Sequence, residues 1–406
     1  MTLVIFVAPM FSPAASQMIE AAASLAGVKL AVIAQEPLER LAPDIARRLA
    51  GHWRVDDITD ASQLEWAARE LSARLGPIAR LFGAYEQAQL PLALTRERLG
   101  IPGLPSAAAM NFRDKARMKD VLRAAGVPVA RHRLIAERSD AVEFIADVGF
   151  PIVVKPPAGA GAIATHRVAD IAELDALFAS YPPSVESPLL AEEFLRGTEH
   201  SLETVSIDGR AIWYSLTHYL PTPLTVLENP WVQWGVVLPR EVDDAYFDDI
   251  RAVGEKALRA LGMTTGVSHC EWFRRADGTV AISEIAARPP GAQITTMIAR
   301  AHDIDFVGAW TRLIVEGTFA IPTRKYAVAT AYLRGQGKGR VTGIDGLDAV
   351  QHELAPLICD VRLPTIGQVP NGSYEGEGFI ILRHPDTATV QRALQYVVST
   401  VRVHLG

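Results

Sequence analysis

The first hundred residues alternate between short apolar runs and longer segments with helical spacing. Three runs have the length of strands: Leu3 to Ala8, Leu30 to Ala34 and Ile78 to Phe82. Three segments have the apolar spacing of helices: residues 15–25, 61–75 and 87–99. Strands that alternate with helices predict a doubly wound parallel sheet, so we expect an α/β fold here. The first strand is not followed by G-x-G-x-x-G, so we do not expect a dinucleotide in this part.

Composition limits the classes of partner. The chain has 406 residues, 49% of them hydrophobic, and a net charge of −6, which disfavours binding to nucleic acid. Only two cysteines are present, Cys270 and Cys359, so neither a disulfide framework nor a zinc cluster is expected. No stretch approaches ~20 uninterrupted apolar residues, so no membrane partner is expected. The apolar start lacks a preceding basic segment and predicts a first strand, and we expect a cytoplasmic protein.

Two glutamates lie on either side of a predicted hairpin turn. Glu271 and Glu284 each belong to a β-rich run, and Asp277-Gly278 between the runs is a typical turn. Adjacent carboxylates repel each other unless a cation lies between them, and Mg²⁺ prefers carboxylates together with phosphates and water. The alternative is a surface hairpin with two solvated glutamates. Arg288, held before Pro289-Pro290, favours a site that handles phosphate or carboxylate.

Other charged residues lie at the ends of predicted elements. Lys155 ends an apolar strand and precedes a glycine-rich segment, residues 158–162, where backbone N–H groups can contact phosphate. Residues 111–125 have a helical pattern, and Lys115 lies at the start of its Asp114-Lys115-Ala116-Arg117 part. Glu192-Glu193-Phe194-Leu195 ends another strand, and Glu199 follows it. Each segment has an ordinary alternative, such as a solvated lysine, a simple turn or a charged strand end.

Taken in order, these motifs resemble the ATP-grasp superfamily from about Asn111 to about Ile294. Within it the chain is similar to the L-amino acid ligases, a group of carboxylate–amine ligases. It is similar more distantly to biotin carboxylase and carbamoyl-phosphate synthetase. The resemblance implies an ATP-grasp architecture, α/β overall and α+β in the nucleotide half. The implied parts are an N-terminal βαβ domain (1–110), a small mobile lid subdomain (111–190), a central subdomain with the metal and substrate site (191–320) and a strand-rich C-terminal subdomain (321–406).

The resemblance also implies residue roles, with ATP and Mg²⁺, or Mn²⁺ in its place, as cofactors. Glu271 and Glu284 would bind the metal. The nucleotide would contact Lys115, Lys155, Gly159, Gly161, Glu192, Phe194, Leu195, Glu199 and Phe273. Two departures from the family pattern stand out. Ala286 replaces the asparagine that many members have at the second metal position. The lid segment lacks the usual serine and arginine, for which Arg167 or backbone groups could substitute.

The implied reaction joins a small carboxylate, with an amino acid as one substrate, to an amine through an acyl phosphate, and releases ADP and phosphate. Arg288 would be the catalytic residue that steadies the carboxylate. His200, His218 and His269 are candidates to accept the proton of the amine, although a structural role is common for histidine. Trp231, Trp234 and Gly291 are substrate-site candidates, and the tryptophans are equally typical of core packing. Two other functions stay open: an enzyme of the biotin carboxylase or carbamoyl-phosphate type that acts on bicarbonate, and a non-catalytic nucleotide-binding protein. A homodimer is also possible.

Overall fold

The computed structural model describes residues 1–159 and 164–406. The N-terminal part is a parallel sheet of order β3-β2-β1-β4, in which β1 spans Thr2–Ala8, β2 Val28–Ala34, β3 Gly51–Arg54 and β4 Ile78–Phe82. Alternate residues of β1 belong to two separate hydrophobic clusters, because successive side chains of a strand point to opposite faces. Helix α1 (Pro13–Ala23) contributes to one cluster and α3 (Ala61–Leu75) to the other. The predicted doubly wound sheet is confirmed.

The predicted helix over 111–125 is wrong at one point, because the chain forms two helices there. Helix α5 (Ser106–Arg113) ends at Asp114, and α6 (Lys115–Ala124) begins after it. Asp114 has extended backbone angles, and its carboxylate accepts a hydrogen bond from the backbone N–H of Arg117 at 2.9 Å. This is the geometry of an N-cap, which offsets the loss of helical bonds at a helix start. Lys115 is therefore the first residue of a new helix.

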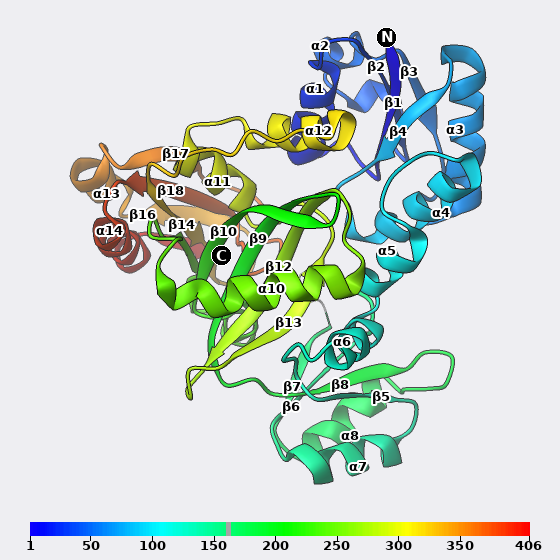
Figure 1. Cartoon of the computed structure of the whole chain (residues 1–406). Helices are drawn as coiled ribbons and strands as arrows, with labels where there is room; N and C mark the ends of the chain where they lie inside the picture. The colour runs from blue at the N-terminus through cyan, green and yellow to red at the C-terminus, as the bar shows by residue number, and fades with distance from the viewer. Residues whose placement is uncertain (160–163) are drawn as a thin grey trace.

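The small subdomain has an antiparallel sheet of order β5-β8-β6-β7. Its strands are β5 (His132–Ile135), β6 (Ile152–Lys155), β7 (His166–Val168) and β8 (Leu189–Glu193). Helices α7 (Arg138–Val148) and α8 (Ile171–Ser180) cover one face and share a hydrophobic cluster with the strands (Figure 1). The other face turns toward the rest of the chain. Most of the glycine-rich segment, including Gly161, lies outside the described residues.

One eight-stranded sheet dominates the remainder, in the order β13-β12-β9-β10-β11-β14-β18-β17. Its strands are β9 (Gly197–Ile207), β10 (Arg210–Leu220), β11 (Gly235–Leu238), β12 (Gly266–Arg275), β13 (Val280–Ala286), β14 (Ala327–Leu333), β17 (Ile358–Arg362) and β18 (Gly378–His384). Strands β14, β17 and β18 extend the sheet across the expected boundary at 320/321. Helix α10 (Asp248–Leu261) packs on β9 and β12 through Leu202 and Trp272 (Figure 1).

The other elements complete the layers around this sheet. Four more helices precede the C-terminal region: α4 (Gln89–Leu99), α9 (Pro223–Glu228), α11 (Ile294–His302) and α12 (Phe306–Glu316). The C-terminal region holds the helices α13 (Leu347–Leu354) and α14 (Thr387–Thr400) and the strands β15 (Gly335–Gly337), β16 (Val341–Asp345) and β19 (Arg402–Leu405). A search of the described residues finds none of the helices long and hydrophobic enough for a bilayer. The expected cytoplasmic location and homodimer stay predictions.

Candidate active site

A cavity of about 470 Å³ lies between the small sheet and the large sheet. Its walls come from β6 and β8 on one side and from β12 and β13 on the other, so it forms only where the two sheets face each other. Fourteen residues predicted to belong to the site line this cavity: Lys115, Lys155, Gly159, Glu192, Phe194, Leu195, Glu199, Trp234, His269, Glu271, Phe273, Glu284, Arg288 and Gly291. The predicted motifs, spread over nearly two hundred residues, therefore converge on one space.

Glu271 and Glu284 face each other across the β12–β13 hairpin. They are register partners in this antiparallel pair, and their side chains are 31% and 23% exposed. Like charges at directly opposed positions destabilise a sheet unless a cation compensates them. Lys115 compensates one of them, since its Nζ lies 2.9 Å from Glu284 Oε1 and also donates to the carbonyl of Gly159 at 2.8 Å. These carboxylates belong to the cavity and are not two solvated surface groups.

His269 connects Glu271 to a second, fully buried carboxylate. Its Nδ1 lies 2.9 Å from Glu203 Oε1, and its Nε2 lies 3.5 Å from Glu271 Oε1. Ser201 and Thr217 donate hydrogen bonds to Glu203 at 2.6 and 3.1 Å. Burial lowers the pKa of His269, but the two carboxylates outweigh burial and raise that pKa to about 9. The ring is therefore an imidazolium at neutral pH, which fits positioning of Glu271 better than acceptance of a proton.

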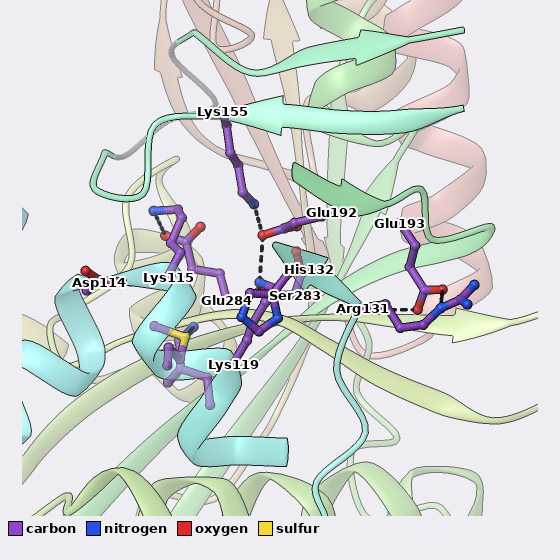
Figure 2. Close-up of polar contacts among 12 residues, drawn as sticks. Asp114, Lys115, Lys119, Arg131, His132, Lys155, Glu192, Glu193, Ser283 and Glu284 are labelled. Carbon is purple, nitrogen blue, oxygen red and sulfur yellow. Dashed lines mark hydrogen bonds and ion pairs between the residues drawn. The ribbon is translucent and has the colours of Figure 1, made fainter. Parts of the chain in front are cut away.

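Three charged residues form a buried cluster on the other side of the cavity. Lys119 Nζ and Lys155 Nζ lie 2.9 and 3.1 Å from the same oxygen, Glu192 Oε1 (Figure 2). Burial favours a neutral Glu192, but the two ammonium groups lower the pKa of Glu192 to about 2. Lys119 is fully buried and also donates to the carbonyl of Ser283 at 2.6 Å. The sequence analysis missed Lys119, although its spacing of one helical turn from Lys115 places both on one face of α6.

Arg288 forms an ion pair with a glutamate of the N-terminal domain. Its Nε lies 2.7 Å from Glu86 Oε2, and one terminal nitrogen donates to the carbonyl of Pro289 at 2.9 Å. Glu86 follows strand β4 and is buried. The sequence analysis missed Glu86, because no local motif marks a single glutamate after a strand. Among the described residues the other terminal nitrogen has no partner, so it is available to a ligand in the cavity.

Three predicted substrate residues lie elsewhere among the described residues. His200 stacks on Trp272 with ring centroids 4.5 Å apart, and its Nδ1 lies 2.6 Å from His218 Nδ1. Burial lowers the pKa of His200 to about 3 and that of His218 to about 4, so both rings are neutral. Trp231 is 67% exposed at the surface. None of these three lines the cavity, whereas Trp234 does.

Comparison with known proteins identifies the domain to which this cavity belongs. Residues 120–302 match the family model of the ATP-grasp domain. The chain carries an ATP-grasp domain. It is 26% identical over 266 residues to the L-arginine-specific L-amino acid ligase of Bacillus subtilis, a match that covers 63% of this chain and 63% of the ligase. The matched region therefore spans a little under two thirds of that relative.

Solved structures share the fold of this chain. The L-amino acid ligase of Bacillus licheniformis has a TM-score of 0.77 at 19% identity, over 100% of this chain and 99% of that one. A carboxyaminoimidazole ribonucleotide synthase from Aspergillus clavatus, complexed with ATP, has a TM-score of 0.72 at 17% identity, over 98% of each chain. These likenesses confirm the predicted ATP-grasp architecture.

The ATP-grasp cavity suits a metal that nucleotide phosphates help to bind. Among the described residues, no group of three or more His, Cys, Asp or Glu is arranged to hold a metal ion alone. Glu271 and Glu284 provide two carboxylates, the number that Mg²⁺ takes when phosphates and water complete its octahedron. Ala286 lines the same cavity and offers only a methyl group. Lys115 and Lys155 also line it, and their ammonium groups would offset the charge of phosphate oxygens bound there.

We predict that the Glu192 cluster makes stability sensitive to acid. A carboxylate whose pKa is lower in the folded state stabilises the fold at every pH above its unfolded pKa, which is about 4.3 for glutamate. For Glu192, with a folded pKa of about 2, this contribution is about 3 kcal/mol. It is lost as the pH falls from about 4.3 toward 2. Glu192→Gln should therefore lower the free energy of unfolding at pH 7 by about 3 kcal/mol, since two buried ammonium groups lose their partner. The difference from wild type should narrow between pH 4.5 and pH 2 in urea titrations followed by circular dichroism.

Glu193→Gln is the matched control. Glu193 neighbours Glu192 on β8, but its partner Arg131 is 56% exposed, so the change should cost less than about 1 kcal/mol (Figure 2). A Glu192→Gln effect that is equally small, or that does not change with pH, would contradict the prediction.

Proposed function

We propose that this protein is an ATP- and Mg²⁺-dependent carboxylate–amine ligase that forms an amide or peptide bond, with an amino acid as one substrate. The observation that carries the proposal is the convergence of Glu271, Glu284, Lys155 and Arg288 on one cavity. Transfer of a phosphoryl group to a carboxylate requires three kinds of group: two carboxylates that bind the metal, a lysine that contacts phosphate, and a guanidinium that binds the substrate carboxylate. The names of the related amino acid ligases support the choice of substrate.

In the proposed reaction, ATP supplies the phosphoryl group that activates the substrate carboxylate. A carboxylate oxygen forms a bond to the γ-phosphorus as the bond to ADP breaks, which gives an acyl phosphate. The amine nitrogen then attacks the acyl carbon, the bond from that carbon to the phosphate oxygen breaks, and the proton lost by the nitrogen ends on the departing inorganic phosphate. Lys115 and Lys155 offset phosphate charge, while Arg288 orients the carboxylate and stabilises the oxyanion that follows. Closure of the small subdomain, still a prediction, would exclude the water that hydrolyses an acyl phosphate.

We predict that wild-type protein releases phosphate from ATP when a panel of amino acids is present, in an assay with Mg²⁺. Glu271→Gln and Glu284→Gln should each abolish this release while thermal melting stays cooperative, because each change removes a ligand charge from the metal. Glu316→Gln, at the exposed end of α12, serves as control and should retain the wild-type rate. Full activity in either cavity variant would overturn the metal assignment. Release that needs bicarbonate in place of an amino acid would favour a carboxylase.

We also predict that Arg288→Lys separates nucleotide binding from chemistry. Lysine keeps the charge but lacks the planar fork that can contact Glu86 and a carboxylate together. Nucleotide affinity measured by calorimetry should change little. Amino-acid-dependent phosphate release should fall roughly a hundredfold, the usual cost of one oxyanion donor. The same change at the exposed Arg312 should have no effect, and a normal rate in the Arg288→Lys variant would remove Arg288 from the mechanism.

A further inference from the structure

The C-terminal region contributes a wall to the cavity. The segment between β17 and β18 brings Tyr374 and Glu375 into the cavity lining. Hydrogen bonds hold this segment in place: Asn371 donates to the carbonyl of Gly376 at 2.7 Å, and Glu377 accepts from the backbone N–H of Gly335 at 2.6 Å. The first of these bonds closes a turn within the segment, and the second joins the end of the segment to β15.

Aromatic rings surround this end of the cavity. Trp234 stacks on Tyr332 with ring centroids 4.6 Å apart and meets the edge of Tyr374 at 4.6 Å. Tyr219 packs against Trp234 at 5.7 Å. Trp234, Tyr219 and Tyr374 all line the cavity, whereas Tyr332 supports them from the core. Aromatic faces attract cations, and the attraction strengthens where water is excluded.

Glu375 is a carboxylate without an ion-pair partner among the described residues. Within residues 1–159 and 164–406, its side chain forms neither an ion pair nor a hydrogen bond, although it is partly buried. Glu86, Glu192 and Glu284, by contrast, each face a cation within about 3 Å. Burial raises the pKa of Glu375, and the charge of Arg362 offsets only part of that rise. A carboxylate in this setting gains most from a ligand that brings a positive charge.

Tyr374 lies next to this carboxylate in the same wall of the cavity. Arg288 and Glu271 line that cavity as well. One cavity therefore holds both the guanidinium proposed to bind a substrate carboxylate and the wall with Tyr374 and Glu375. An amino acid bound through Arg288 would place its side chain in the space that this wall borders.

We propose that Glu375, Tyr374 and Trp234 form a subsite for a substrate side chain that ends in a cation, either the guanidinium of arginine or the ammonium of lysine. This inference rests on the proposed function, because it assigns the amino acid that the ligase activates. The charge of Glu375 selects the terminal cation, and the aromatic rings contact the side chain leading to it.

Arginine and citrulline give a direct test, since the two have nearly the same shape and only arginine is charged. Calorimetry on wild-type protein with Mg²⁺ and a non-hydrolysable ATP analogue should give an affinity for arginine at least about tenfold above that for citrulline. Glu375→Gln should abolish this preference, and Glu375→Asp should retain part of it. Glu353→Gln, an exposed glutamate of α13, should leave it unchanged.

Equal affinities in wild type, or a preference that survives Glu375→Gln, would overturn the subsite. Phosphate release measured in parallel keeps the two proposals distinct. Turnover of neutral amino acids that is the same in wild type and Glu375→Gln, without an arginine preference, would keep the ligase and remove the subsite. Arginine binding that depends on Glu375 but never leads to phosphate release would keep the subsite and remove the ligase. Neither binding nor release with any amino acid would overturn both.

Discussion

The shared carboxylate of Glu192 connects the two halves of the active-site cavity. Lys155 reaches it from β6, Lys119 reaches it from α6, and Lys119 also donates to the carbonyl of Ser283 on β13. One buried anion thereby links the small sheet, a helix and the large sheet. Because an unpaired charge in a protein interior costs several kcal/mol, this cluster favours the arrangement in which the small sheet faces the large sheet. The cavity walls are positioned by an electrostatic constraint as much as by hydrophobic packing.

This cluster also leaves charge available for phosphate. Two lysines share one glutamate, so one positive charge is in excess beside the cavity. Lys115 pairs with Glu284, the same carboxylate that we assign to the metal. A divalent cation bound as proposed would therefore compete with Lys115 for Glu284, and the displaced lysine would be free to contact a phosphate oxygen. Glu271 has a separate partner in His269, so its orientation does not depend on this exchange.

The local sequence pattern was enough to predict the helices and strands, and to predict the site residues that lie at their ends. The hairpin with Glu271 and Glu284, the strand that ends at Lys155 and helix 61–75 follow from turn residues and apolar spacing. The break at Asp114 was missed, because an aspartate within a helical pattern is compatible with both a cap and an exposed position. Contacts between distant residues were also missed. Lys119 and Ser283 are 164 residues apart, and Glu86 and Arg288 are 202 apart, so neither pairing has a local signal.

The sources of the cavity walls explain how such a fold can keep its chemistry and change its substrate. The proposed metal and phosphate residues come from the small and central subdomains, where backbone pairing and the Glu192 cluster fix them. Glu86 comes from the N-terminal domain, and Tyr374 with Glu375 comes from a segment between two C-terminal strands. A segment between strands tolerates substitution more readily than a paired strand, because it lies outside the backbone pairing of the sheet. The side-chain subsite is therefore the part of the cavity in which charge and size can change without disturbing the proposed phosphoryl-transfer groups.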